Sequence, residues 1–249
     1  MRRGFRSCAV ATSALLAMTA CTSRAQDSSA AAIDSKQYAA LKWRPAGAAG
    51  GKCDTPSGAP RAVANADGKT HVVCADASRK GLLYAATTNG VYVSFDDGAH
   101  WQSLELNLPV ADVRELRVAG DDLVAVSAAQ KAWILEDVSP LRQAGPDLDS
   151  AAAFLLEPIV ATADRGATID FYFRETPKTE VTIEVRNAQR KVMKTFNSAT
   201  GAERLTKHAG LNRIAWNLHG DDGAPLAAGK YEVMLIGADT IMKRTLVVQ

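Results

Sequence analysis

Short runs of alternating apolar and polar residues, separated by glycine and aspartate turns, dominate the chain from His71 onwards. The runs are HVVCA, LLYAATT, VYVSFD, WQSLEL, VRELRV, LVAVSA and AWILED. Because each run is short, rich in β-branched or aromatic residues and bounded by turn signals, the pattern predicts an antiparallel meander. Tight turns are expected at 88–90, 96–98 and 120–122, where glycine, asparagine and aspartate tolerate a positive φ.

A second set of alternating runs follows a break at 140–154, where two prolines interrupt the strand pattern. In ATIDFYFR, Ile169, Phe171 and Phe173 face one way, while Asp170 and Tyr172 face the other. The runs VTIEVRN, KVMKTF, LNRIAWNL, GKYEVMLIG and IMKRTLVV continue the alternation. Six or seven short strands within roughly 100 residues predict a β-sandwich. The aromatic residues Trp101, Trp133, Trp216 and Tyr231 are expected in the core rather than on a carbohydrate-stacking surface.

The first 20 residues have the pattern of a targeting segment. MRRGFR supplies three arginines and no acid, and the apolar or small run SCAVATSALLAMTA follows it. The run ends in MTAC, which resembles the bacterial lipobox, so we expect a lipoprotein signal peptide at 1–20 and a lipid on Cys21. An ordinary signal peptide cut near Ala25 is the alternative. Thr22, rather than aspartate, follows the cysteine and favours the outer membrane.

Residues 21–62 are rich in alanine, serine and glycine and show no sustained apolar period, which predicts a flexible tether. Removal of the signal peptide takes away three arginines and no acid, so the formal charge falls from +2 to −1 (+2 − 3). The remaining lysines and arginines are scattered, and we expect no nucleic-acid partner.

Four cysteines are present, with Cys8 in the signal peptide and Cys21 as the predicted lipid acceptor. Cys53 and Cys74 remain, and an oxidising compartment would favour a disulfide between them. Such a bridge closes a loop of about 20 residues and stabilises the fold by about 3 kcal/mol in the loop-entropy treatment. Two free thiols are the alternative.

The motif SFDDGAHW carries a family resemblance. Its residues Ser94, Asp96, Gly98 and Trp101 resemble the Asp box of sialidase-like and sortilin-like β-propellers with BNR-type repeats, with His100 where threonine is usual. GLLYAATTNGVYVSFDDGAHWQSLELNLPVADVRELRVAGDDLVAV resembles the last blades of such secreted bacterial proteins, and YAALKWRPAGAAGG resembles their opening. AGLNRIAWNLHGDDGAPLAAGKYEVML resembles the immunoglobulin-like domain that follows those propellers, and the one in flagellar hook-capping proteins.

The resemblance implies an internally truncated member of that family. A blade takes about 40 to 50 residues and a closed propeller needs at least about four blades, whereas 71–143 has room for less than two. We therefore predict an all-β fold with a partial propeller region at 63–143, a linker at 144–165 and an immunoglobulin-like or fibronectin-like sandwich at 166–249. Open sheet edges predict that the blade region packs on the sandwich, associates with another chain or is marginally stable.

The candidate chemistry is sparse. Asp96 and Asp97 are adjacent and point in different directions, so they do not suit the two carboxyl groups that flank a glycosidic bond. Arg114, Arg117 and Arg142 do not match the arginine triad that a sialidase resemblance would imply. His71, His100, His208 and His219 lie far apart in sequence, and we expect no metal site, catalytic residue or cofactor.

These patterns predict a non-enzymatic lipoprotein of the bacterial cell envelope that binds or scaffolds a protein or a glycan. We expect it to be held by the Cys21 lipid, at the outer membrane, facing the periplasm or the cell surface, with possible association through exposed sheet edges. Two alternatives remain open: a glycoside hydrolase-related, sialidase-like protein with hydrolytic activity, as the resemblance implies, and a non-functional truncated remnant.

Overall fold

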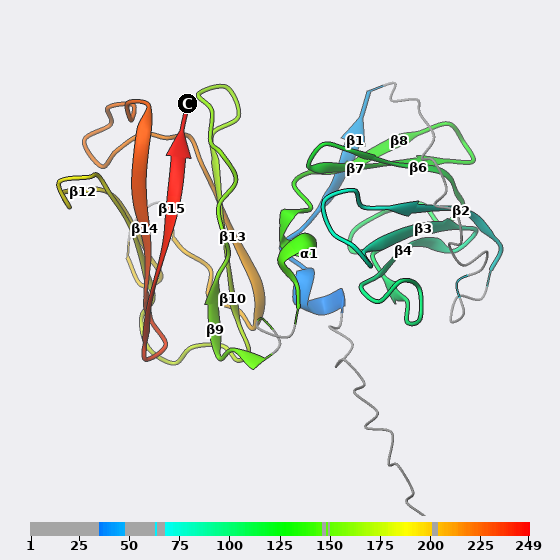
Figure 1. Cartoon of the computed structure of the whole chain (residues 1–249), viewed down its shortest axis with the longest axis horizontal. Helices are drawn as coiled ribbons and strands as arrows, with labels where there is room; N and C mark the ends of the chain where they lie inside the picture. The colour runs from blue at the N-terminus through cyan, green and yellow to red at the C-terminus, as the bar shows by residue number, and fades with distance from the viewer. Residues whose placement is uncertain (1–34, 48–62, 64–67, 146–147, 149, 201–203) are drawn as a thin grey trace, which may run out of the picture. The chain divides into compact units, whose positions relative to one another are not determined.

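The computed structural model describes residues 35–47, 63, 68–145, 148, 150–200 and 204–249, and this part of the chain is nearly all β, with only short helical segments (Figure 1). The predicted signal peptide lies outside the described residues. The elements of the N-terminal half are η1 (Ser35–Tyr38, a 3₁₀ helix), β1 (Trp43–Ala46), β2 (Thr70–Ala75), β3 (Leu83–Thr87), β4 (Gly90–Ser94), β5 (Gln102–Ser103), β6 (Val113–Ala119), β7 (Asp122–Ser127), β8 (Ala132–Leu135) and α1 (Ser139–Gln143).

The first sheet of the N-terminal half is the predicted meander. Its order is β2-β3-β4-β5, and each strand pairs antiparallel with the next one along the chain. The turn between β3 and β4 lies at 88–89, and the turn between β6 and β7 lies at 120–121, as predicted. Gly90 and Gly120 have φ of 127° and 64°. Glycine reaches these values without the steric penalty of a side chain, so the turn chemistry in the sequence is confirmed.

The second sheet contains a strand that the sequence pattern did not predict. Its order is β1-β8-β7-β6, so β1 joins three consecutive strands from far away in the sequence, with Trp43 opposite Leu135. Leu41 and Trp43 are only 1% and 2% exposed. Residues 35–46 are therefore folded, which corrects the expectation of a flexible tether for this part of 21–62. A four-residue strand shows too few alternations to stand out in a sequence rich in alanine and glycine.

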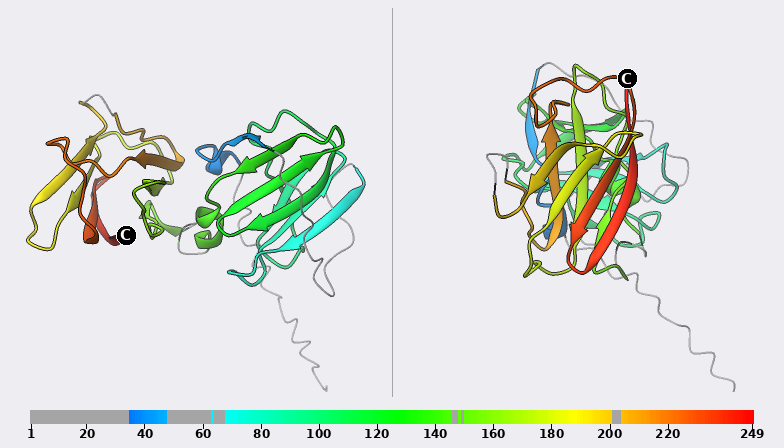
Figure 2. Two further views of the ribbon diagram at one scale, coloured as in Figure 1. Left: turned by 90° about the horizontal axis from the view of Figure 1, so that it is seen from above. Right: turned by 90° about the vertical axis from the view of Figure 1, so that its left-hand side faces the viewer.

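The two sheets bury one shared core. Strand β6 contacts β2 and β3, and Figures 1 and 2 show the second sheet lying over the first. Core residues from both sheets are Leu82, Tyr84, Val91, Leu104, Leu116, Leu123 and Leu135. The segment 71–143 has room for fewer than two propeller blades, as its length in the sequence indicates. Strand β1, from outside that segment, completes the second sheet as its fourth strand. Each open sheet thus covers an apolar face of the other, which a single repeat unit cannot do alone.

The C-terminal half is a two-sheet sandwich, as predicted. Its sheets have the orders β13-β10-β9 and β12-β11-β14-β15, and all pairs are antiparallel. The strands are β9 (Ala153–Leu155), β10 (Ala167–Phe173), β11 (Thr182–Arg186), β12 (Val192–Asn197), β13 (Gly210–Trp216), β14 (Gly229–Gly237) and β15 (Thr240–Val248). Ile169, Phe171 and Phe173 are fully buried in its core, on the face that the alternation predicted.

The sandwich begins earlier than the predicted linker at 144–165 allowed. Strand β9 pairs with β10, and Ala153, Leu155 and Ala161 are buried in the sandwich core. The N–H of Ala161 also donates to the carbonyl of Val247 on β15 (2.8 Å). Pro158 and the run of alanines hide this short strand from a periodicity argument, because three residues cannot define a period.

The second face of β10, carrying Asp170 and Tyr172, is buried as well. Tyr172 and Leu211 are 4% and 6% exposed and belong to the core of the N-terminal half. Gly210 has a φ of 92°, and a Cβ there would lie 2.9 Å from the carbonyl oxygen of Gln37 in η1. Packing on the sandwich is therefore how the open sheets cover this part of their core.

Candidate functional site

The segment 94–101, in which the sequence pattern predicted an Asp box, forms a closed hydrogen-bonded turn after β4. The Ser94 hydroxyl donates to Asp96 Oδ1 (2.8 Å) and accepts the N–H of Gly98 (2.9 Å). The N–H of His100 also donates to Asp96 Oδ1 (2.9 Å). Trp101 is 5% exposed and packs against the face of the first sheet that is turned away from the shared core. These contacts give Ser94, Asp96, Gly98 and Trp101 a structural role in the hairpin.

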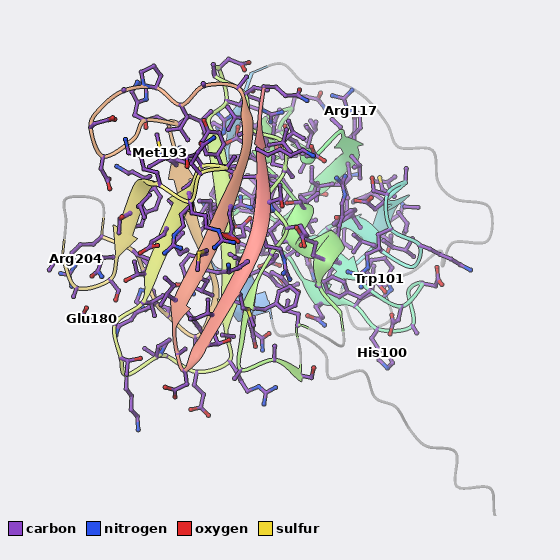
Figure 3. All side chains as sticks on the ribbon, turned by 60° about the vertical axis from the view of Figure 1, so that its left-hand side comes forward. His100, Trp101, Arg117, Glu180, Met193 and Arg204 are labelled. Carbon is purple, nitrogen blue, oxygen red and sulfur yellow. The ribbon has the colours of Figure 1, made fainter. Side chains whose placement is uncertain are left out.

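Asp96 and Asp97 do not face each other across a cleft. Asp97 is exposed with a φ of 57°, and its N–H donates to the carbonyl of Gly81 (3.0 Å). Asp96 Oδ2 lies 2.6 Å from Nδ1 of His100, whose side chain is at the outer end of the hairpin (Figure 3). Burial raises the pKa of Asp96, but the hydrogen bonds from His100 and Ser94 outweigh it and hold that pKa below its ordinary value. The ionised carboxylate is thereby committed to the turn.

Cys74 is fully buried and disulfide-bonded. Its partner lies outside the described residues, as do Cys53 and the predicted lipid acceptor Cys21. The pairing of Cys53 with Cys74 and the lipidation of Cys21 stay predictions.

The charged cluster around Arg142 ties the two N-terminal sheets together. From α1, Arg142 donates through Nε to Asp76 Oδ2 (2.9 Å) and through Nη1 to Asp121 Oδ1 (2.5 Å). Nη2 donates to the carbonyl of Gly120 (2.6 Å). Burial lowers the pKa of Arg142, but the two carboxylates outweigh it and raise that pKa above its ordinary value. Burial, together with the charge of Asp76, raises the pKa of Tyr84, whose hydroxyl lies 3.4 Å from the same carboxylate.

A second cluster, around Arg213 on β13, joins the sandwich to the N-terminal half. Its Nε and Nη2 donate to the two carboxylate oxygens of Asp170 (both 2.8 Å), and Nη2 also lies 3.0 Å from Asp137 Oδ2. Nη1 donates to the carbonyl of Glu136 (3.2 Å). Burial raises the pKa of Asp170 above its ordinary value, although the hydrogen bonds and charge of Arg213 act in the opposite direction. Two carboxylates thus share one guanidinium inside the fold.

Sequence reasoning missed both clusters because their members are distant in the chain. Arg142 is 66 residues from Asp76, and Arg213 is 76 residues from Asp137. The one local signal was Asp170, an acid in an otherwise apolar strand, since a buried acid needs a cationic or hydrogen-bonding partner.

A groove of about 400 Å³ opens in the N-terminal half between residues 39–42 and residues 103–107. Lys42 and Glu105 both line it, together with Leu41, Leu106 and Asn107. Among the described residues, neither Lys42 nor Glu105 has an ion pair or a side-chain hydrogen bond. Unpaired charges of both signs beside an apolar floor can bind a polar ligand.

The surface of the β12-β11-β14-β15 sheet that points away from the sandwich core is here called the outer sheet face. By register, Ile241, Ile236 and Thr182 lie in one row across it, and Lys243, Met234 and Glu184 lie in the next. Ile241 is 64% exposed. Val192, on β12 at the opposite edge of the same sheet, is 38% exposed.

Four charged side chains on the outer sheet face form two ion pairs with one another. Nη2 of Arg186 donates to Glu184 (2.5 Å), and Nζ of Lys243 lies 3.0 Å from Glu232. Exposed aliphatic side chains among mutually neutralised charges resemble the composition of a protein-docking surface more than that of an ordinary solvated face.

The aromatic residues are core anchors, as predicted. Trp101, Trp216 and Tyr231 are 5%, 4% and 9% exposed, and Trp133 packs against the N-terminal core. A stacking platform for a sugar ring needs an exposed aromatic face, so these four side chains do not provide one.

At several sheet edges, backbone groups are hydrogen-bonded by residues outside the sheet. The side-chain amide of Asn107 accepts the N–H of Trp43 (2.7 Å) and donates to its carbonyl (2.9 Å), as a neighbouring strand would. On β12, the carbonyl of Met193 (Figure 3) accepts the N–H of Asp221 (2.8 Å). On β15, the carbonyl of Val247 accepts the N–H of Ala161 (2.8 Å). Occupied backbone groups limit edge-to-edge pairing, so the edges are a weaker partner site than the outer sheet face.

Within the described ranges, no group of three or more histidine, cysteine, aspartate or glutamate residues is arranged to hold a metal ion. In the same part of the chain, no helix has both the length and the apolar character needed to cross a bilayer.

Comparisons with known proteins identify no family for the chain. No family model matches, and no curated protein matches. The sialidase-like and sortilin-like resemblance therefore stays a prediction.

Two solved structures show a low similarity to the chain. One is PorZ, an essential bacterial surface component of the type-IX secretion system of Porphyromonas gingivalis: 14% identity, 73% of this chain, 23% of that chain and a TM-score of 0.28. The other is the extracellular domain of a putative hybrid two-component system of B. thetaiotaomicron: 11% identity, 74% of this chain, 26% of that chain and a TM-score of 0.23. The chain spans about a quarter of the length of either structure. At such TM-scores neither similarity bears on function.

Proposed function

We propose that the protein is a non-enzymatic lipoprotein of the bacterial cell envelope that docks a protein partner on its outer sheet face. The observation that carries this proposal is Ile241, a large aliphatic side chain that is 64% exposed on a regular sheet surface. Burial of such a side chain against a partner stabilises the complex by roughly 1.5–3 kcal/mol. The partner expected is a protein with an apolar centre and polar surroundings, because the face offers aliphatic contacts beside the ion pairs Arg186–Glu184 and Lys243–Glu232.

A protein partner is favoured over a glycan because of the aromatic residues. The tryptophans of the described chain are committed to the cores, whereas the outer sheet face presents isoleucine, valine and threonine. Aliphatic side chains of this kind pack well against protein but offer no ring for stacking on a sugar.

The docking proposal is tested by site-specific photo-cross-linking in intact cells. A photoreactive amino acid replaces Ile241, and the matched control replaces Lys178, which is exposed on a loop of the same sandwich. We expect a discrete cross-linked partner at position 241 only. With that partner purified, Ile241→Glu should weaken binding by about tenfold or more while the thermal midpoint stays unchanged, because the side chain is exposed. Equal cross-linking at both positions, or unchanged affinity of Ile241→Glu, would contradict the proposal.

The anchor is tested separately by metabolic labelling with a radioactive fatty acid. We expect labelling and membrane fractionation that both disappear in Cys21→Ala. Labelling that persists in Cys21→Ala would overturn the lipoprotein assignment without touching the docking face.

A further inference from the structure

The groove between residues 39–42 and 103–107 has walls that are fixed before any ligand arrives. The indole Nε1 of Trp43 donates to the carbonyl of Leu104 (3.0 Å), which ties the two walls at their base. The amide of Asn107 clamps both backbone groups of Trp43. The N–H of Leu41 donates to the backbone carbonyl of Tyr38 (2.9 Å), and the N–H of Leu108 donates to the backbone carbonyl of Glu105 (2.6 Å). In a pre-formed site, fewer groups lose conformational entropy when the ligand binds, so the binding free energy is more favourable.

The groove keeps its shape partly because of a glycine and a strained leucine. A Cβ on Gly90, whose φ is 127°, would lie 2.7 Å from Cγ and Oε1 of Glu105. Gly90 therefore leaves the space that the Glu105 side chain occupies. Leu106, which lines the groove, has a φ of 49°, a conformation that a bulky side chain rarely adopts unless the surrounding structure holds it.

The chemistry of the lining has three parts. Lys42 supplies an ammonium group and Glu105 a carboxylate, and in the described chain the two do not pair with each other or with another side chain. Ala39 and Leu106 supply an apolar surface in the same groove. The volume of about 400 Å³ lies within the usual range of small-molecule pockets.

The geometry points to a binding site for a small zwitterion with an apolar side chain, namely a free amino acid or a short peptide with both termini unblocked. The ligand carboxylate binds the ammonium of Lys42, and the ligand ammonium binds the carboxylate of Glu105. The ligand's apolar side chain lies over Ala39 and Leu106. A ligand with only one of these charges leaves the opposite protein charge without a partner, so the site discriminates by charge at both ends. This site is independent of the outer sheet face and of the proposed protein docking.

The test is isothermal titration of the full chain, purified in detergent, with the dipeptide alanyl-leucine. A ligand of this size is expected to bind with a Kd of about 1 mM. Lys42→Met and Glu105→Gln should each weaken binding by about tenfold, the effect of one charge-assisted hydrogen bond. Lys131→Met and Glu175→Gln are matched controls on exposed residues away from the groove, and they should leave the affinity unchanged.

Blocked dipeptides assign each charge to its partner. N-acetyl-alanyl-leucine should bind about tenfold more weakly, and Glu105→Gln should not weaken it further. The C-terminal amide should behave in the same way towards Lys42→Met. Absence of heat with alanyl-leucine, equal affinity for blocked and free dipeptides, or variants that bind as well as the parent would each overturn the proposal. A thermal melt of every variant separates these results from misfolding.

Discussion

Arg142 and Arg213 are two solutions to the same problem, since each joins separate sheets by binding two carboxylates. Around Arg142, the Asp76 side chain is fully buried, but Asp121 is 42% exposed. Around Arg213, both carboxylates are enclosed, because the side chains of Asp137 and Asp170 are 9% and 6% exposed. Water therefore solvates the Asp121 carboxylate of the Arg142 cluster. It is largely excluded from both carboxylates of the Arg213 cluster.

The comparison teaches that burial, rather than the number of ion pairs, decides what such a cluster does. Because water solvates Asp121, the Arg142 cluster behaves much like a single buried ion pair between Arg142 and Asp76. The Arg213 cluster encloses one surplus negative charge, and desolvation raises the free energy of its ionised state. The junction between the sandwich and the N-terminal half is thus the more sensitive of the two to mutation and to pH.

The largest effect is expected from Arg213→Met. The substitution keeps much of the side-chain volume and leaves two enclosed carboxylates without their cation, so the free energy of unfolding should fall by about 3–5 kcal/mol. Urea unfolding measures it. Arg114→Met is the control, because Arg114 is 50% exposed and pairs with the partly exposed Asp112; its loss should stay below about 1 kcal/mol. If both substitutions had equal effects, the Arg213 cluster would behave as a surface pair.

Arg142→Met should come next, with a loss of about 2–3 kcal/mol. The effect is smaller because Asp121 remains in contact with water. Asp76 also keeps the N–H of Ser78 (2.8 Å) and the hydroxyl of Tyr84 as donors. The same urea titration ranks the two arginines, and a larger loss for Arg142→Met than for Arg213→Met would reverse the comparison.

The pH dependence should differ between wild type and Asp170→Asn. The pKa of Asp170 is raised by burial in the folded state, so the folded chain binds that proton more tightly than the unfolded chain does. This contribution to stability therefore grows as the pH falls through the raised pKa, and it is complete below the unfolded value of about 3.9.

Asp170→Asn cannot gain stability in this way, because the amide of asparagine does not titrate. Unfolding measured at several pH values gives the difference between the two proteins. Wild type should become relatively more stable as the pH falls. The pKa values of Asp96 and Asp112 are lowered, and their opposite contributions cancel because both proteins retain them. A difference that is flat with pH would show that Asp170 stays ionised throughout.

The smallest effect is expected from Asp121→Asn. Because Asp121 is 42% exposed, its pair with Arg142 competes with water, and its loss should lower the free energy of unfolding by less than about 1 kcal/mol. Added salt should shrink that difference further. A loss as large as that of Arg142→Met would mean that Asp121, and not Asp76, is the main partner of this arginine.

Local patterns in the sequence predicted the parts of the fold that depend on local contacts. The alternation in ATIDFYFR placed Ile169 and Phe171 in the core, and the glycine turns fixed the hairpins. The turn at 94–101 depends on contacts at most four residues apart, such as Gly98 with Ser94. In each case the partner lies within one turn or one strand period.

The features that the sequence did not predict depend on partners far apart in the chain. Strand β1 becomes part of a sheet only because Trp43 pairs with Leu135. The face of β10 that carries Tyr172 is buried only because the N-terminal core covers it. Lys42 and Glu105 line the same groove although 63 positions separate them. No periodicity within a segment carries such information, because it lies in how segments meet.

Strand β1 also sets the order in which the N-terminal half can fold. Among the described strands it leaves the ribosome first, yet its partner β8 is synthesised after six further strands. Closing so long a loop is slow, and until it closes the free edge of Ala132–Leu135 can template pairing with another chain. The edge of β8 therefore stays open to such pairing until β1 has docked on it, and a fragment that lacks residues 43–46 would carry that edge permanently.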